Sequence, residues 1–184
     1  MRGFLFVCAA VSTLAALPAL AQTKTAMMAA TLEGSDGKGA GSVMLTEAPK
    51  GVLIKISLKG LKPGWHGLHL HEKGDCGTPD FKSAGGHVHG AGTAVHGLLN
   101  PQANEAGDLP NVFVAADGTG EAEVFSPWTS LTGEGGRTKL LDDDGSALVV
   151  HASPDDHIAQ PIGNAGGRVA CAVLQSPANF FKKQ

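Results

Sequence analysis

Histidines with a distinctive spacing are the residues of this chain best suited to chemistry. His69 and His71 alternate with leucines in Leu68-His69-Leu70-His71, and His87 and His151 follow further along. Successive side chains of an extended segment point to opposite faces, so His69 and His71 would project from one face about 7 Å apart. Imidazoles suit copper and zinc, and nitrogen ligands without a nearby thiolate favour a copper ion that cycles between two oxidation states. The spacing therefore predicts a metal site.

The first 21 residues have the pattern of an export signal. Arg2 precedes an apolar run from Phe4 to Leu20 that finishes at Ala19-Leu20-Ala21, a small-residue cleavage site. We expect cleavage after Ala21, which leaves a single domain over residues 22–184. A membrane anchor would need about 20 apolar residues without such an ending. The sequence therefore predicts an exported protein without a membrane anchor.

Two cysteines, Cys76 and Cys171, remain once the signal with Cys8 is removed. In an oxidising compartment they most simply pair as a disulfide, the alternative being two free buried thiols. The net charge of −3 and the lack of a basic run argue against nucleic acid as a partner.

The composition and the periodicity favour an all-β domain. The chain has 26 glycines among 184 residues, and its apolar segments are short and broken by Gly, Pro and Asp. Residues 54–59 alternate strictly, and seven further strands are expected at 24–33, 41–46, 65–72, 111–116, 120–125, 147–152 and 168–174. Eight short strands predict a β-sandwich or barrel, with Asp117-Gly118 as a tight hairpin turn.

Two stretches lack any period. Residues 73–110 contain His87, His89, His96 and Cys76, and a connection of this length in a compact domain is usually functional. Metal and a disulfide would account for its order. The second stretch, residues 126–145, includes Trp128, which we expect to act as a lid or a packing residue.

Several motifs resemble those of the copper-zinc superoxide dismutases in their bacterial exported form. They occur in the family's order at 66–76 (HGLHLHEKGDC), 83–87 (SAGGH), 107–111 (GDLPN), 148–151 (LVVH) and 163–171 (GNAGGRVAC). The resemblance implies an eight-stranded Greek-key β-sandwich or barrel with a long metal-binding loop, and a periplasmic location. It also implies a disulfide between Cys76 and Cys171.

The resemblance implies a role for most of the histidines. The copper ligands would be His69, His71, His87 and His151, with His87 bridging to zinc. Arg168 would guide the anionic substrate, and the carboxylate of Asp155 would hydrogen-bond a copper histidine and a zinc histidine. His66 lies on the leucine face of its strand, so we expect a core histidine bonded to a loop. His157 is expected at the surface.

The zinc side departs from the family's pattern. His87, His96 and Asp108 occupy three of the family's four zinc positions, but the fourth, three residues before the aspartate, is Glu105 instead of histidine. A carboxylate can ligate zinc, so Glu105 could take that place. Two alternatives stay open: His89 replaces it, or the site binds zinc weakly or not at all.

The implied activity is the conversion of superoxide into dioxygen and hydrogen peroxide, with His87 as a proton donor. As a further hypothesis, Lys73 and Lys82 help to focus the electric field on the site, the alternative being that both are ordinary solvated lysines. The competing hypothesis is a periplasmic copper-binding or copper-storage module of the same fold with little turnover. A monomer and a homodimer are both compatible with the sequence.

Overall fold

The computed structural model describes residues 25–176, so the expected export signal at 1–21 lies outside the described residues. All eight expected strands are present, with shifted ends. They are β1 (Met27–Gly34), β2 (Gly39–Ala48), β3 (Gly51–Leu58), β4 (Gly64–His71), β5 (Asp108–Val114), β6 (Gly120–Ser126), β9 (Ser146–His151) and β10 (Arg168–Leu174). None of the helices in the described part is long and apolar enough to cross a membrane.

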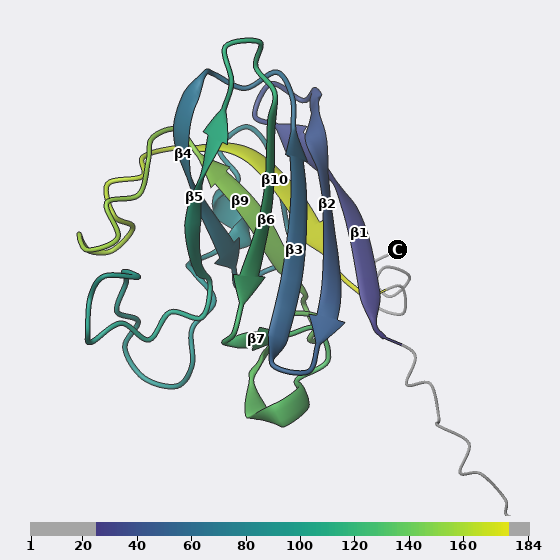
Figure 1. Cartoon of the computed structure of the whole chain (residues 1–184), viewed down its shortest axis with the longest axis vertical. Helices are drawn as coiled ribbons and strands as arrows, with labels where there is room; N and C mark the ends of the chain where they lie inside the picture. Colours follow the sequence, from purple (N-terminus) through teal and green to yellow (C-terminus); the bar gives the residue numbers. More distant parts are fainter. Residues whose placement is uncertain (1–24, 177–184) are drawn as a thin grey trace, which may run out of the picture.

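One antiparallel sheet in the order β5-β4-β9-β10-β1-β2-β3-β6 curls into a nearly closed barrel (Figure 1). The strand order confirms the predicted all-β Greek-key barrel. Asp117 and Gly118 occupy the turn between β5 and β6, where the Ala115 amide donates to the Thr119 carbonyl over 2.7 Å. The predicted hairpin is wrong in one respect: among the described residues these two strands share no ladder, because they form the two ends of the sheet.

Alternation along the strands fills the barrel with one apolar core. Val52, Ile54, Ile56 and Leu58 of β3 are all at most 3% exposed, whereas Lys55 and Ser57 between them face solvent. Leu68 and Leu70 of β4 join the same core and are fully buried. The leucine face of β4 is thus inside, and its histidine face is directed outwards.

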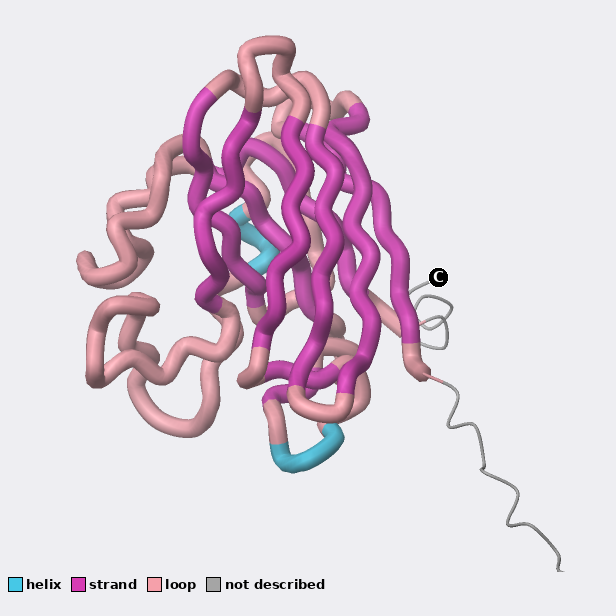
Figure 2. The backbone as a smooth tube through the Cα atoms, viewed as in Figure 1, coloured by secondary structure: helices cyan, strands magenta, loops and turns pink. Residues whose placement is uncertain are grey.

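Loops cover that outward face of β4. The connection from β4 to β5 contains only one short helical turn, η1 (Lys82–Ala84), and it lies on the same side of the barrel as the connection from β9 to β10 (Figures 1 and 2). His69 and His71 are consequently 0% exposed although they point away from the barrel core. The long irregular connection predicted from the sequence is confirmed.

The predicted disulfide closes the first part of this connection. Cys76 and Cys171 are bonded, with Cα atoms 5.8 Å apart and a sequence separation of 95. Cys171 belongs to a small second cluster with the fully buried Phe81 and Ala84. In the chain-entropy view a loop of about 100 residues contributes about 4.7 kcal/mol to stability.

The stretch 126–145 is more ordered than its sequence suggests. It contains two short strands that we did not expect, β7 (Thr129–Ser130) and β8 (Thr138–Lys139), paired in parallel, and the turn η2 (Glu134–Gly136). The buried carboxylate of Glu47 holds it in place, because it accepts hydrogen bonds from the Ser130 hydroxyl, the Leu131 amide and the Arg137 guanidinium.

Candidate metal centre

The strand register brings the expected site residues together. His69 of β4 stands opposite Asp108 of β5, and Arg168 of β10 stands opposite His151 of β9. An isolated bridge pairs His71 with His87 across the start of the long connection. Six residues from five separate stretches of chain thereby meet on the covered face of β4.

Four histidines form the first group of potential ligands. One ring nitrogen from each of His69, His71, His87 and His151 lies within 4.8 Å of the other three. These atoms are Nδ1 of His69 and Nε2 of the other three, and each is buried without a hydrogen-bond partner. Buried polar atoms are normally paired, so four unpaired nitrogens directed at one point indicate a metal position.

The opposite nitrogen of each ring is held in place. His71 donates through Nδ1 to the carbonyl of Gly85 over 3.0 Å, and His151 donates through Nδ1 to that of Gly166 over 3.1 Å. His69 donates through Nε2 to the carboxylate of Asp155 over 2.9 Å. Such contacts fix the tautomer and orientation of a metal-binding imidazole.

His87 connects this group to a second one. Its Nε2 belongs to the first group, while its Nδ1 lies 2.7 Å from Glu105 Oε2 and 3.1 Å from Asp108 Oδ1. The Nδ1 atom of His96 approaches the same two oxygens at 3.0 and 2.9 Å. Two imidazoles and two carboxylates, all nearly buried, thus surround a second position.

Glu105, and not His89, contacts both rings of the second group. The two residues face each other in an isolated bridge, but the His89 ring turns away and donates to the carbonyl of Gly90 over 2.7 Å. Histidine and carboxylate ligands in a group of four are suited to zinc. The residues present therefore fit zinc, with one more carboxylate than the family's pattern has.

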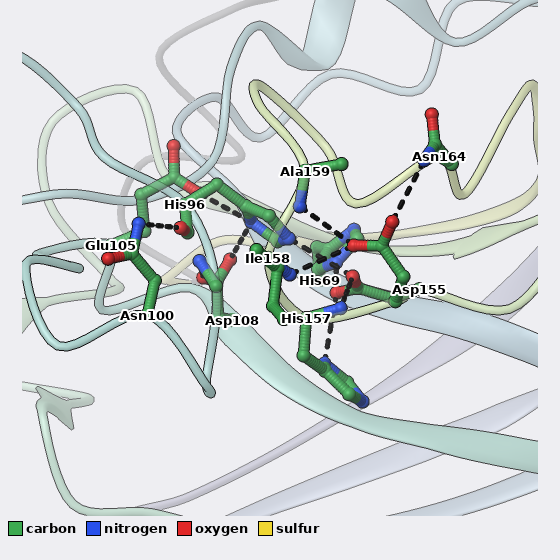
Figure 3. A network of polar contacts seen from close by, with 12 residues as sticks. His69, His96, Asn100, Glu105, Asp108, Asp155, His157, Ile158, Ala159 and Asn164 are labelled. Carbon is green, nitrogen blue, oxygen red and sulfur yellow. Dashed lines mark hydrogen bonds and ion pairs between the residues drawn. The ribbon is translucent and has the colours of Figure 1, made fainter.

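Asp155 hydrogen-bonds one ring of each group, His69 of the first and His96 of the second (Figure 3). One oxygen accepts from His69 over 2.9 Å, and the other accepts from His96 Nε2 over 3.1 Å. The Asn111 side chain fixes the Asp155 backbone, since its amide donates to the Asp155 carbonyl and its oxygen accepts from the Asp155 amide, both over 2.8 Å. The sequence motif 107–111 includes Asn111, but gave no indication of this function.

Burial and charge give the two groups opposite proton affinities. Burial lowers the pKa of His69 to about 4, that of His151 to about 3 and that of His71 to about 2, so these rings are neutral, as metal binding requires. Burial lowers the pKa of His96, but hydrogen bonds to Asp108, Asp155 and Glu105 outweigh this effect and raise the pKa to about 11. A cation in the second group would replace protons held there.

Arg168 is fixed at the edge of the first group. Its guanidinium donates to the carbonyls of Phe81 and Gly85, each over 2.6 Å. The Gly85 carbonyl also accepts from His71, so one backbone oxygen positions both a ring of the first group and the arginine. Phe81 has a left-handed backbone, φ 53°, and a fully buried side chain. No pattern in the sequence identifies these carbonyl anchors.

Two further histidines can be compared with their predictions. His66 is buried, and its ring lies between the carbonyls of His151 and Lys62, as expected for a core histidine. His157 is less exposed than its expected surface position implies. Its side chain is only 19% exposed, and its Nδ1 lies 3.3 Å from Asp155 Oδ2, because the turn after Asp155 folds the ring back towards Asn111.

Comparison with known proteins agrees with this geometry. Residues 39–174 match the family model of the copper/zinc superoxide dismutases. The chain belongs to this family. A superoxide dismutase [Cu-Zn] of Caulobacter vibrioides is 67% identical over 146 residues, which are 79% of this chain and 84% of that protein. The family name gives copper and zinc, and two groups of potential ligands in this chain are consistent with two metal sites: His69, His71, His87 and His151 in one, and His69, His87, His96 and Asp108 in the other.

Solved structures show the same fold. A SOD-like protein from Bacillus subtilis superposes with a TM-score of 0.74 at 38% identity, covering 81% of this chain and 99% of its own. The Cu/Zn superoxide dismutase from Brucella abortus gives a TM-score of 0.64 at 30% identity, with coverage of 81% and 99%.

Proposed function

We propose that this protein is a periplasmic superoxide dismutase that converts two superoxide ions and two protons into dioxygen and hydrogen peroxide. The observation that carries the proposal is the convergence of four unpaired, buried ring nitrogens within 4.8 Å of one another. Family membership supports it. Arg168 beside the first group distinguishes an enzyme for a small anion from a copper-storage module, which needs no fixed cation.

In this proposal His69, His71, His87 and His151 would hold copper, and His87, His96, Asp108 and Glu105 would hold zinc. The two groups share His87, whose unpartnered Nε2 belongs to the first group and whose Nδ1 lies beside Glu105 in the second. The turned-away ring of His89 favours Glu105 as the fourth zinc ligand. Bound copper would supply the one-electron acceptor and donor that disproportionation needs.

The chain's own residues bind the substrate and supply a proton. Superoxide is a small anion, and the charge of Arg168 attracts and orients it beside the first group. The Nε2 atom of His87 has no protein partner, so it can hold a proton and deliver it to the reduced oxygen species. Glu105 and Asp108 favour the protonated ring, because hydrogen bonds to them raise the pKa of His87 in spite of its burial.

The location and the assembly form the second part of the proposal. The apolar segment and the cleavage site at 1–21 support export to the periplasm, which fractionation of cells would test. Trp65 of β4 and Phe113 of β5 pack edge to face at 5.2 Å and remain 55% and 50% exposed. Exposed aromatic pairs favour an interface, so we expect a homodimer over a monomer. Sedimentation of the double variant Trp65→Ser, Phe113→Ser should then show only monomer.

One preparation tests the activity and the metals together. We expect one copper and one zinc for each chain by mass spectrometry of the purified mature protein, with rapid consumption of superoxide by the same sample. Copper with turnover but no zinc would exclude the proposed zinc ligands. Bound copper without turnover would instead support a copper-binding or copper-storage module.

A further inference from the structure

A cavity lies behind the second group of ligands and contributes to no step described so far. Its volume is about 480 Å³, and it separates residues 90–108 of the β4–β5 connection from residues 128–138. We call it the loop cavity. Its lining includes Leu98, Asn100, Ala103, Glu105, Asp108 and Trp128.

The long polar side chains around the loop cavity are occupied by the protein itself. Asn100 donates to the His96 carbonyl and accepts from the Gln102 amide, and Asn104 bonds the backbone of Val95 and Thr93. Arg137 donates to Glu47 and to the carbonyls of Thr129 and Pro49. The side chains of Asn100, Asn104 and Arg137 are therefore engaged by the protein itself and are poorly suited to bind an organic ligand. The salt bridge with Glu47 also offsets the charge of Arg137.

Glu105 is the ligand that faces this space most openly. Its side chain is 5% exposed, against 2% for His87, 1% for Asp108 and 0% for His96. Both histidine contacts fall on Oε2, so neither ring engages Oε1. A carboxylate at a cavity wall, with one oxygen that neither ring engages, is a suitable first contact for an arriving cation.

The other sides of the second group are closed. The His87 ring stacks on His69 with centroids 3.9 Å apart. The turn at Gly163 packs so closely on the opposite side that an added Cβ would lie 1.6 Å from Asp155 Oδ1 and 2.9 Å from His96 Nε2. The Gly97 amide donates to Asp108 Oδ2 over 2.7 Å and closes the third side.

We propose that the loop cavity is the path by which zinc enters and leaves the second site, with Trp128 at its mouth and Glu105 as the first ligand met. Trp128 lines the cavity and is 65% exposed, as expected for a residue at the rim. The inference depends on the proposed zinc site. An entry path can be distinguished from a binding site by experiment. Obstruction of the path slows the entry and the exit of zinc equally, so the affinity of the site for zinc stays unchanged.

Isotope exchange on the holoprotein tests this difference. The purified protein with its native zinc is mixed with an excess of an enriched zinc isotope, and the bound isotopes are followed by mass spectrometry. Ala103→Trp places a large side chain in the cavity and should slow exchange about tenfold, which corresponds to an added barrier of about 1.4 kcal/mol. Trp128→Ala should accelerate exchange. Zinc content should stay the same in both variants.

The matched control is Ala116→Trp, which introduces the same side chain at an exposed position beyond the other end of β5. It should leave the exchange rate unchanged. Unchanged exchange in both Ala103→Trp and Trp128→Ala would overturn the path while leaving the zinc site intact. Should Ala103→Trp lose zinc, Trp128→Ala decides: faster exchange supports the path, and an unchanged rate refutes it. Wild-type protein purified without zinc would refute the site itself.

Discussion

Asp155 holds His69 and His96 with its two carboxylate oxygens, at 2.9 and 3.1 Å, so a single side chain orients one ring of each proposed metal site. The carboxylate also accepts from the His157 amide over 2.6 Å. These contacts hold its pKa well below the ordinary value in spite of burial, and the group remains an anion. The negative charge makes both rings better donors of electron density to a metal.

Replacement of Asp155 by asparagine should therefore weaken zinc binding about 10- to 100-fold, the usual effect of losing such a partner. The amide has the same shape but can accept from only one of the two rings. Competition with a chromophoric chelator measures the affinity. Asp156→Asn is the control, because this exposed neighbour caps the Ile158 and Ala159 amides and contacts neither ring. Equal zinc affinities in the two variants would contradict the role of Asp155.

Gly163→Ala should disrupt the same network by steric conflict. Its Cβ would lie 1.6 Å from Asp155 Oδ1, and the backbone is left-handed with φ 59°. Gly37→Ala separates the two causes, since Gly37 has φ 76° but no atom within 4 Å of an added Cβ. We expect Gly37→Ala to cost only the left-handed strain of about 1–2 kcal/mol and to retain both metals. Gly163→Ala should lose zinc, which metal analysis would detect.

Strict alternation of a strand predicts that two residues of the first group, His69 and His71, share a face, whereas His87 and His151 are assigned by the family resemblance. The pattern of Leu68 to His71 places the leucines in the barrel core and the histidines on the covered face, as the structure shows. Strand positions follow from the same alternation. The turn at Asp117-Gly118 was located correctly, but whether its two strands form a ladder depends on closure of the whole sheet, which a local pattern does not encode.

The second group shows where local patterns are insufficient. Glu105 and His89 are cross-strand partners in one bridge, and both are chemically able to bind zinc. Only the packing of the long connection decides which side chain turns inwards. The sequence also does not predict that the carbonyls of Phe81, Gly85 and Gly166 accept hydrogen bonds at the site. Every residue has a carbonyl, and only the fold directs these three at the site.

Arg168 should contribute both charge and geometry to the rate. Arg168→Gln removes the cation beside the first group and should lower kcat/KM by at least about tenfold at low salt, within the usual range for electrostatic steering. Arg168→Lys keeps the charge but loses the forked contact with Phe81 and Gly85, so an intermediate rate is expected. Stopped-flow consumption of superoxide at several salt concentrations measures both effects. Lys59→Gln, an equal change of charge at an exposed residue near the end of β3, should retain nearly the full rate.

The pH dependence of the metal-free protein follows from the opposed pKa shifts. Burial lowers the pKa of His69 to about 4, that of His151 to about 3 and that of His71 to about 2, from an ordinary value of 6.5. The unfolded chain then binds these protons first, so stability is lost as the pH falls below 6.5. His96 has the opposite sign. Its pKa is raised to about 11, so its stabilisation is complete below pH 6.5 and disappears as the pH rises towards 11.

Thermal unfolding of the metal-free protein should therefore show maximal stability near pH 6.5, with a decline on both sides. The two limbs belong to different residues and can be separated by substitution. His96→Gln should weaken the alkaline limb, because Gln does not titrate, and leave the smaller part that belongs to His87, whose pKa is also raised. The acid limb should stay, because the three buried histidines remain. An alkaline limb of unchanged size in His96→Gln would show that the carboxylates around His96 do not stabilise its charge. Bound zinc should remove the alkaline limb, because it replaces the protons held in the second group, whereas the acid limb should remain, because the unfolded chain still binds protons below pH 6.5.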